Sequence, residues 1–164
     1  LFCLKRHKGI IKTFPGLIKA FTKFYVLKKG NKTDFKEKMY RFLPYVNIEK
    51  DLPEFWASHK NNIKDWYYKT QREDDVIISA SPEFLLEPIC KELGIKYLMA
   101  SKVDMKTGKY EGINCHGKEK VRRFYEMFPN GKIEDFYSDS YSDSPLAEIS
   151  KKAFLVKGNE LKDW

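Results

Sequence analysis

Two carboxylates stand four residues apart in a serine-rich segment, as Asp139 and Asp143 of SDSYSDSP (138–145). A strand is expected to end just before Asp139 and a helix to begin just after Asp143, so the loop between them can turn both side chains to the same side. Carboxylate oxygens, completed by the phosphate oxygens of a substrate, are ligands that Mg²⁺ prefers. The segment therefore predicts part of a Mg²⁺ site, although Ser and Asp are also common in turns and helix caps.

A second segment could hold an anionic oxygen. Ser79, Ala80 and Ser81 directly follow the short β-branched run 76–78 and precede an expected helix. In parallel sheets ligands bind at such junctions, because the strand end and the helix N-terminus present unpaired backbone N–H groups. The alternative is that Ser81 only caps the helix, with Pro82 in the first turn.

A third segment, HGKEKVRRF (116–124), places Lys118 and Lys120 in the first turn of a helix. Positive charge is unfavourable there because the helix dipole already makes that end positive, and a bound anion would remove the conflict. The alternative is that Glu119 partly neutralises the turn and that both lysines extend into solvent.

The elements that must position these residues alternate after residue 71. We expect strands at 76–78, 97–103, 135–137 and 153–156, with helices after Pro82, over 117–128 and from Ser144, and a hairpin-like excursion at 106–112. This order predicts an α/β fold with a parallel sheet covered by helices on both faces. We also expect a kink at Pro88, within the helix that follows Pro82.

Residues 1–70 instead show helical spacing of apolar residues, typical of about four helices, with Thr33 and Asn47 as candidate N-caps. Charge follows the same division: residues 1–70 hold 16 Lys or Arg and 6 Asp or Glu, a net charge of +10, whereas residues 71–164 hold 15 and 17, a net charge of −2. A basic half favours binding of nucleic acid or attraction of a small anion, or is simply a solvated lysine-rich surface.

Composition narrows the class of protein. Hydrophobic residues make up 42% of the 164 residues, which excludes a disordered chain. No run is long and apolar enough to span a membrane, and we expect no membrane partner. Three cysteines without a paired spacing fit free thiols in a reducing compartment, so we expect a cytoplasmic protein. Cys115 and His116 are expected to be structural, since neighbours on an extended segment point to opposite sides.

The segments VIISASPEFLL (76–86), GKEKV (117–121) and YSDSYSDSPL (137–146), in this order and spacing, resemble motifs two, three and four of the haloacid dehalogenase superfamily. The likeness is closest to its phosphoserine-phosphatase-like branch. The resemblance implies a three-layer Rossmann-like core over residues 71–164 with a helical cap domain over residues 1–70. It also implies a phosphatase of small phosphorylated substrates that uses Mg²⁺.

Carried over by motif, the resemblance assigns a role to each candidate residue. Ser79, with the amides of Ala80 and Ser81, would hydrogen-bond the transferring phosphoryl group. Lys120 would neutralise its charge, with Lys118 as the competing candidate for this role. Metal ligation would come from Asp139 and, through water or a hydrogen bond, from Asp143; both glycines and the asparagine of the family's fourth motif are replaced here.

One motif of the family is not found in this chain. Members carry Asp-x-Asp, whose first Asp attacks phosphorus, and the chain contains no such pair. We therefore expect an upstream segment that holds a central strand and the nucleophile, without which the chain alone would be inactive. The alternatives are a phosphotransferase or an inactive member of the same fold, and, from another class, a non-enzymatic nucleic-acid-binding protein that uses the basic half. The substrate and the oligomeric state are not readable from the sequence.

Overall fold

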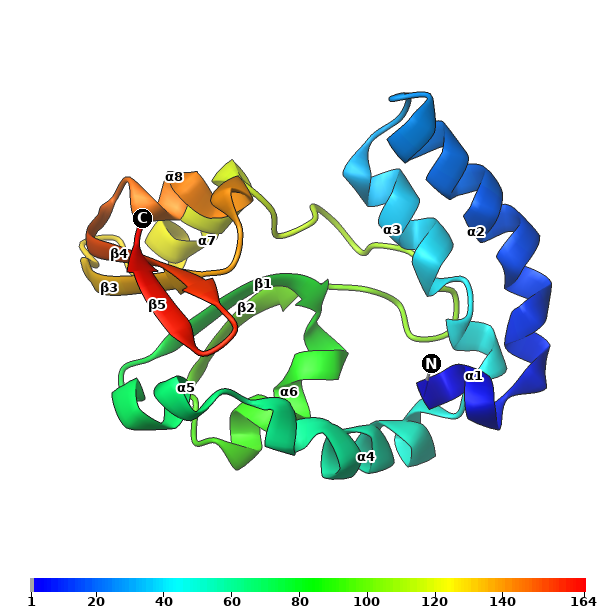
Figure 1. Ribbon diagram of the computed structural model, residues 1–164, viewed down its shortest axis with the longest axis horizontal. Helices are drawn as coiled ribbons and strands as arrows, with labels where there is room; N and C mark the ends of the chain where they lie inside the picture. The colour runs from blue at the N-terminus through cyan, green and yellow to red at the C-terminus, as the bar shows by residue number, and fades with distance from the viewer. Residues whose placement is uncertain (1) are drawn as a thin grey trace. The chain divides into compact units, whose positions relative to one another are not determined.

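The computed structural model describes residues 2–164 and has the predicted α/β class, with parallel strand pairs and many helices (Figure 1). The chain divides into two compact units. A helical unit extends to His59 and includes the later segment Lys102–Gly112, and an α/β unit comprises Lys60–Ser101 and Ile113–Trp164. The helical unit contains 16 Lys or Arg and 7 Asp or Glu, a net charge of +9.

The helical unit is a succession of short helices. They are α1 (Phe2–Arg6), a 3-10 helix (Lys8–Thr13), α2 (Phe14–Phe21), a π-helical turn (Thr22–Val26), α3 (Lys32–Tyr40), a 3-10 turn (Leu43–Tyr45) and α4 (Ile48–His59). The expected cap at Asn47 is confirmed, since its side chain accepts a hydrogen bond from the Lys50 amide at 3.1 Å. The expected cap at Thr33 is wrong: α3 begins one residue earlier, and the Asn31 side chain accepts from the Asp34 amide at 2.8 Å.

The segment Lys102–Gly112 contains the hairpin-like excursion predicted at 106–112 and begins four residues earlier. Val103 and Tyr110 form an antiparallel bridge, and the Tyr110 amide donates to the Glu37 carboxylate of α3 at 3.1 Å. Gly108 turns the excursion with φ +72° directly against the backbone carbonyl of Tyr40. These contacts attach the excursion to the helical unit, although its two ends continue into the α/β unit.

The α/β unit alternates strands and helices, as the sequence predicted. Its elements are a 3-10 turn (Lys60–Asn62), α5 (Asp65–Thr70), β1 (Val76–Pro82), α6 (Glu83–Glu92), β2 (Tyr97–Ser101), α7 (Lys118–Met127), β3 (Ile133–Ser138), a 3-10 turn (Tyr141–Asp143), α8 (Ser144–Ala147), β4 (Ser150–Lys157) and β5 (Glu160–Asp163).

The strands form two separate groups. β1 pairs with β2 in parallel, with Ile77 opposite Leu98, and β3 pairs with β4 in parallel, with Phe136 opposite Ala153. An antiparallel β5, not predicted, pairs with β4 through a turn at Gly158. Within residues 2–164, β1 and β3 do not pair with each other.

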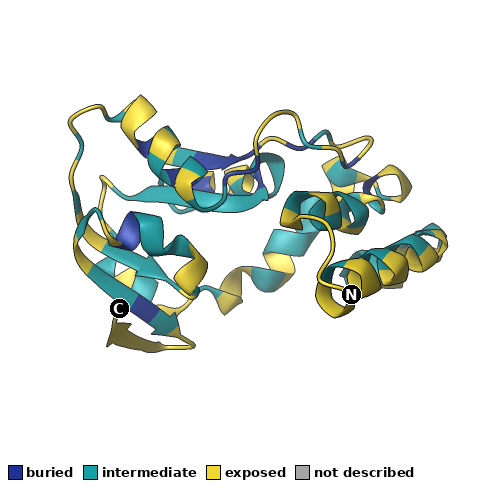
Figure 2. Cartoon of the chain, turned by 90° about the horizontal axis from the view of Figure 1, so that it is seen from above, coloured by how far each residue is buried: buried dark blue, intermediate teal, exposed yellow. Residues whose placement is uncertain are grey.

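Helices α6 and α7 cover the strands of the α/β unit. α6 packs against β1 and β2, while α7 contacts β2 and α8, and α8 contacts β4. Figure 1 shows α6 below β1 and β2, and α7 and α8 above the level of these strands. The buried apolar residues of this unit, among them Met99, Phe124, Leu146 and Leu155, come from these elements (Figure 2).

One local expectation at the start of α6 is corrected. Ser81 does not cap the helix: β1 continues to Pro82, and the Ser81 amide instead donates to the Ser79 hydroxyl at 3.1 Å. Pro88 lies inside α6, and the kink expected there stays a prediction. Separately, none of the helices in residues 2–164 has the length and apolar character needed to cross a membrane.

Replacing Gly108 by Ala tests the attachment of the excursion. The added Cβ would overlap the Tyr40 carbonyl at a positive φ, so we expect a loss of about 2–4 kcal/mol in the free energy of unfolding. Gly158→Ala is the matched control, because Gly158 also has positive φ (+64°) but nothing lies within 4 Å of its added Cβ. Denaturant unfolding that shows equal losses for both variants would contradict the close contact.

Candidate functional site

The predicted site residues come from four elements of the α/β unit. Ser79 lies in β1, Lys120 in the first turn of α7, Asp139 just past the end of β3, and Asp143 immediately before α8. All four line one cavity of about 570 Å³, which is bounded on its two sides by β1 and β3. The chain thus brings together side chains from three segments, the most distant of which, Ser79 and Asp143, are 64 residues apart, and these side chains can act on one ligand.

A buried ion pair lies at the centre of this group. The Lys120 ammonium is 2.7 Å from the Asp143 carboxylate, and the two side chains are only 8% and 12% exposed. The Ser138 hydroxyl donates to the same carboxylate oxygen at 2.8 Å. Because a lysine in the first helical turn opposes the helix dipole, the Asp143 charge provides the compensation that the sequence required.

The structure distinguishes the two candidate lysines by position. Lys120 is buried within the cavity wall, whereas Lys118 is exposed. Glu119 contacts neither: it accepts hydrogen bonds from Arg122 at 2.8 Å and from Arg123 at 2.8 Å. Glu119 therefore neutralises arginines further along α7, whereas the sequence had left open that it neutralises the lysines of the first turn.

The loop that carries the carboxylates is held by serine side chains. The Ser138 hydroxyl accepts from the Ser140 amide at 3.2 Å, and the Ser140 hydroxyl accepts from the Ser142 amide at 3.2 Å. Ser144 donates to the Tyr141 carbonyl at 2.8 Å. These bonds give the loop a defined turn where the resembling family uses glycines. Ser138 was not identified from the sequence, although its position at the end of β3, directly before Asp139, could have indicated it.

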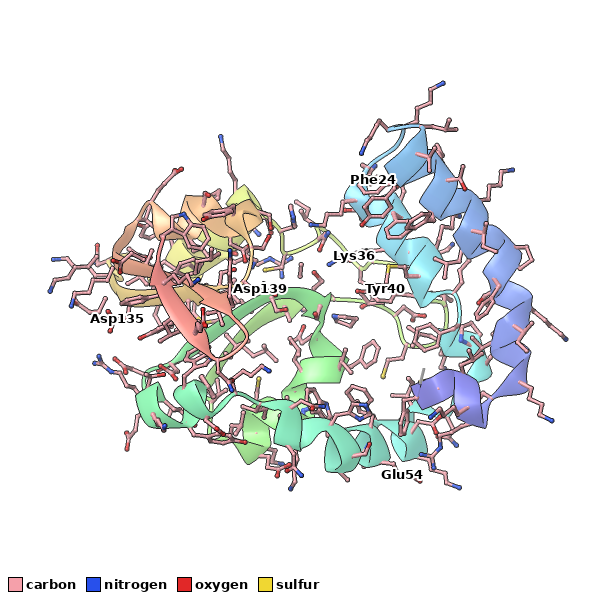
Figure 3. The ribbon with its side chains drawn as sticks, viewed as in Figure 1. Phe24, Lys36, Tyr40, Glu54, Asp135 and Asp139 are labelled. Atoms are coloured by element: carbon pink, nitrogen blue, oxygen red, sulfur yellow. The ribbon has the colours of Figure 1, made fainter. Side chains whose placement is uncertain are left out.

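Asp139 differs from Asp143 in its surroundings. It is exposed, and Figure 3 places it beyond the end of β3, whereas Asp135 lies near the start of that strand. Oxygen from an exposed carboxylate suits Mg²⁺. Among residues 2–164 no three His, Cys, Asp or Glu side chains lie close enough to hold a metal. Asp139 and Asp143 could therefore supply part of an oxygen site that needs further ligands.

Ser79 retains a donor for a ligand. Its hydroxyl oxygen accepts the Ser81 amide at 3.1 Å, so its own O–H can point to another acceptor. Ser79 lines the cavity, but Ala80 and Ser81 are not among the lining residues. Ala80 and Ser81, for which anion contacts were predicted, therefore do not form part of the cavity wall.

A buried polar network at the end of β2 was not foreseen. Ser101, fully buried, donates to the Asn114 side chain at 3.0 Å and accepts from the Cys115 amide at 2.9 Å. Burial raises the pKa of the Cys115 thiol, which opposes the thiolate form that a nucleophile needs. The expected structural role of Cys115 agrees with this environment.

Arg123 joins α7 to the segment around this network. Its guanidinium donates to the Ala100 carbonyl at 2.6 Å and to the Ile113 carbonyl at 2.5 Å. Its Nε also donates to the Glu119 carboxylate at 2.8 Å. Because Lys120 lies on the same helical turns, these bonds fix the helix that carries the buried ammonium. Arg123 was not identified from the sequence, because its neighbours in the sequence do not indicate which backbone carbonyls it contacts.

Comparisons with known proteins identify the superfamily that the three segments resemble. A family model described as haloacid dehalogenase-like hydrolase matches residues 5–148. A Mycobacterium tuberculosis protein named a probable phosphatase is 32% identical over 96 residues, which cover 54% of this chain and 33% of that protein. Protein CicA of Caulobacter vibrioides is 31% identical over 81 residues, which cover 46% of this chain and 36% of CicA.

The chain spans about a third of the length of these curated relatives. No solved structure matches the chain significantly.

The arginine contacts of Glu119 predict a pH-dependent stability. The Arg122 hydrogen bond, helped by Arg123, lowers the pKa of Glu119 from 4.5 to about 2. A depressed pKa stabilises the fold above pH 4.5, and this contribution is lost as the pH falls from 4.5 towards 2. At neutral pH, Glu119→Gln should therefore lower the free energy of unfolding by about 1–3 kcal/mol, and the difference from the native chain should shrink in acid.

Urea unfolding at several pH values measures this difference. Glu126→Gln is the control, because Glu126 is exposed and makes a single 3.1 Å contact with Arg122. A Glu119→Gln deficit that stays constant down to the lowest pH would show that the carboxylate is not the stabilising group.

Proposed function

The chain belongs to the haloacid dehalogenase-like hydrolases, and from this premise we propose that it forms most of a Mg²⁺-dependent phosphomonoester hydrolase acting through an aspartyl-phosphate intermediate. The proposed substrate class is a small phosphorylated anion, and the proposed branch is the phosphoserine-phosphatase-like one. The observation that carries the proposal is the buried Lys120–Asp143 pair, which lines one cavity with Ser79 and Asp139.

Lys120 is suited to bind a phosphoryl group. An ammonium has three N–H donors, and Asp143 occupies one direction at 2.7 Å. The remaining donors can reach an anionic oxygen within the cavity, where low exposure makes the charge more effective than in water. Ser79 adds an O–H donor from the wall formed by β1. Together the two side chains would hold and neutralise the transferring group.

Asp139 is the proposed metal ligand and Asp143 its support. The carboxylate of Asp143 is engaged by Lys120 and by the Ser138 hydroxyl, so its contribution to a metal would pass through a hydrogen bond or a water. Asp139 is exposed and its oxygens are accessible. When bound, Mg²⁺ would supply positive charge to the phosphoryl oxygens and orient them. The donor set fits such an ion with further ligands from the substrate and from a second carboxylate.

The cavity between β1 and β3 supports an additional central strand. Within residues 2–164, β1 pairs only with β2, and β3 pairs with β4, so each parallel pair presents an unpaired edge. Residues Val76–Ser79 of β1 and Ile133–Ser138 of β3 line the same cavity. Buried parallel strands need hydrogen-bond partners on both sides. We therefore propose that a strand carrying Asp-x-Asp pairs with both edges and brings the attacking carboxylate beside Lys120.

The proposed reaction has two steps, formation of an acyl phosphate and its hydrolysis. The first aspartate of the inserted strand attacks phosphorus and forms an acyl phosphate, while the second, as its carboxylic acid, gives its proton to the departing alcohol oxygen. The second aspartate then takes a proton from the water that cleaves the acyl phosphate, which releases inorganic phosphate and restores the first carboxylate and the acid form of the second. Lys120 and Ser79 bind the oxygens whose charge develops during both steps. The helical unit is proposed as the cap domain, whose expected bounds of 1–70 change because Lys60–Thr70 lies in the α/β unit. The positive charge of the helical unit would attract an anionic substrate.

A phosphate-release assay on the Lys120→Met variant tests the proposal. The protein assayed is the full-length gene product, with a generic phosphomonoester as substrate. We expect Mg²⁺-dependent release by the native protein and a loss of roughly 100-fold or more in kcat for the variant. Lys118→Met is the matched control, because Lys118 lies in the same turn but is exposed, and it should retain activity within about twofold.

The same assay can contradict the proposal. Absence of an Asp-x-Asp strand in the coding sequence before Leu1, or absence of Mg²⁺-dependent release, would end the catalytic claim. Transfer of phosphate to an alcohol in place of water would instead favour a phosphotransferase. Equal activity of the two lysine variants would refute the role of Lys120.

Replacing Asp139 by Asn tests the metal assignment. The amide keeps the shape of the side chain but removes its charge, so the Mg²⁺ concentration for half-maximal activity should rise by at least about tenfold. Asp163→Asn is the control, since Asp163 is an exposed carboxylate of β5 that does not line the cavity. An unchanged Mg²⁺ dependence of the Asp139→Asn variant would remove Asp139 from the proposed metal ligands.

A further inference from the structure

A cavity of about 340 Å³ lies within the helical unit, between α2 and α3. Figure 1 shows these two helices side by side, joined at one end by the π-helical turn and residues 27–31. The described residues that line this cavity all fall within 16–41, and none of them lines the cavity that contains Lys120. The cavity therefore belongs to the helical unit alone and has no part in the site around Lys120.

Cationic side chains dominate the wall of this cavity. Among residues 2–164 five of them line it, from α2, the π-helical turn, the connecting segment, α3 and the residue after α3: Lys19, Lys23, Lys29, Lys38 and Arg41. Asp34 is the one carboxylate among the described residues of the wall, which gives these side chains a net charge of +4. Like charges gathered in one place repel each other unless a counter-charge lies among them.

The protein itself does not supply this counter-charge. Within residues 2–164 none of the five cations forms an ion pair with a carboxylate, and Asp34 is not paired either. Four of the five cations are exposed and Lys38 is half-buried, so they are accessible to a ligand. A bound anion would provide the missing negative charge.

Two of the cations lie at opposite ends of the cavity. The Arg41 Nη1 is 3.8 Å from the position that a Cβ would occupy on Gly16, and the Lys23 Nζ is 3.9 Å from that position on Gly30. Gly16 and Lys23 are seven residues apart along the chain, which corresponds to about 10 Å along a helix. A compact anion would contact one end only, whereas an elongated anion can contact both.

We propose that this cavity binds a linear diphosphate or triphosphate, either inorganic or as part of a nucleotide. Such a chain of phosphates carries about three or four negative charges at neutral pH, close to the positive charge of the wall. An arginine presents paired N–H donors to phosphate oxygens, and each lysine ammonium adds a point charge. The proposal is independent of the proposed phosphatase activity, because it concerns binding to other residues.

The wall also has an apolar part, formed by Ala20, Phe24 and Phe35. Phe24, labelled in Figure 3, stacks on Phe35 with ring centroids 5.5 Å apart and an interplanar angle of 11°. This contact holds α3 beside the π-helical turn, and so it fixes the two elements that carry Lys23 and Lys38. It also offers apolar surface to the organic group of a nucleotide.

The size of the cavity favours a small anion over a nucleic acid. A volume of about 340 Å³ falls within the range of small-molecule sites. A nucleic acid instead needs cations distributed along a longer surface, because its charge is spread along the backbone. Of the two partners that the basic half of the sequence favoured, a small anion therefore agrees better with this cavity.

Calorimetric titration of the full-length gene product tests the proposal. Inorganic triphosphate and ATP are titrated separately, without divalent cations, so that Mg²⁺-dependent turnover does not contribute. We expect both to bind and both affinities to fall as salt is raised. Tighter binding of ATP than of triphosphate would support contact of the base with the apolar part of the wall.

Three variants test the residues of the site. Lys23→Glu should lower the affinity for triphosphate by at least about tenfold, because it replaces a cation of the wall by an anion. At the other end of the cavity, Arg41→Gln should lower it by at least about fivefold. Lys12→Glu is the matched control: Lys12 is an exposed lysine of the helical unit that does not line the cavity, so the affinity should change by less than about twofold. Thermal unfolding verifies that each variant is folded.

Four results would overturn the proposal. The first is no binding of triphosphate or ATP by the native protein at low salt. The second is an equal loss of affinity in Lys23→Glu and Lys12→Glu, which would show an effect of net charge alone. The third is binding that is lost in Lys120→Met and kept in Lys23→Glu, which would assign the anion to the cavity of the α/β unit. The fourth is binding of a DNA or RNA duplex that is tighter than that of ATP and is lost in Lys23→Glu.

Discussion

A lysine ammonium buried at the N-terminal end of a helix requires a negative charge within hydrogen-bond distance, and in this chain Asp143 supplies it to Lys120. The pair connects α7 to the loop before α8, and Ser138 connects the same carboxylate to the end of β3. Removing either charge would leave the other uncompensated in a poorly hydrated place. The α/β unit is thus organised around an electrostatic contact that also lines its principal cavity, which is why structural and functional demands on these residues coincide.

The division of the sheet has a physical consequence for that cavity. Parallel strands are normally buried on both faces and paired on both edges, because unpaired backbone groups are costly away from water. Here β1 and β3 each present an edge to the space that Lys120, Ser79 and Asp139 line. Within residues 2–164 neither edge has a second strand partner, and the proposed inserted strand would pair with both. This coincidence links the fold of the α/β unit to the proposed reaction.

The helical unit has a different balance of forces. Its positive charge is concentrated in residues 8–41, and several of its large apolar side chains, among them Ile11, Ile18 and Val26, are exposed. Lysines tolerate this arrangement because their aliphatic stems can lie along apolar surface while their ammonium groups stay hydrated. The excursion Lys102–Gly112 is attached to this unit by the Tyr110–Glu37 hydrogen bond and by Gly108, so a segment from the second half of the sequence contributes to it.

Local patterns were sufficient for the alternation of strands and helices, the parallel class of the sheet and the cap at Asn47, because apolar periodicity and side-chain capping act over a few residues. They were also sufficient to select Ser79, Lys120, Asp139 and Asp143 as candidates. They failed for β5, which pairs with the edge of β4, and for Ser81, which lies in β1 and does not cap a helix. Which lysine is buried and which carboxylate is paired depends on contacts between α7 and the loop 138–144, and only the tertiary structure brings those segments together. The sequence by itself determined the chemical groups and their order, whereas burial and pairing between distant segments decided which of them share a cavity.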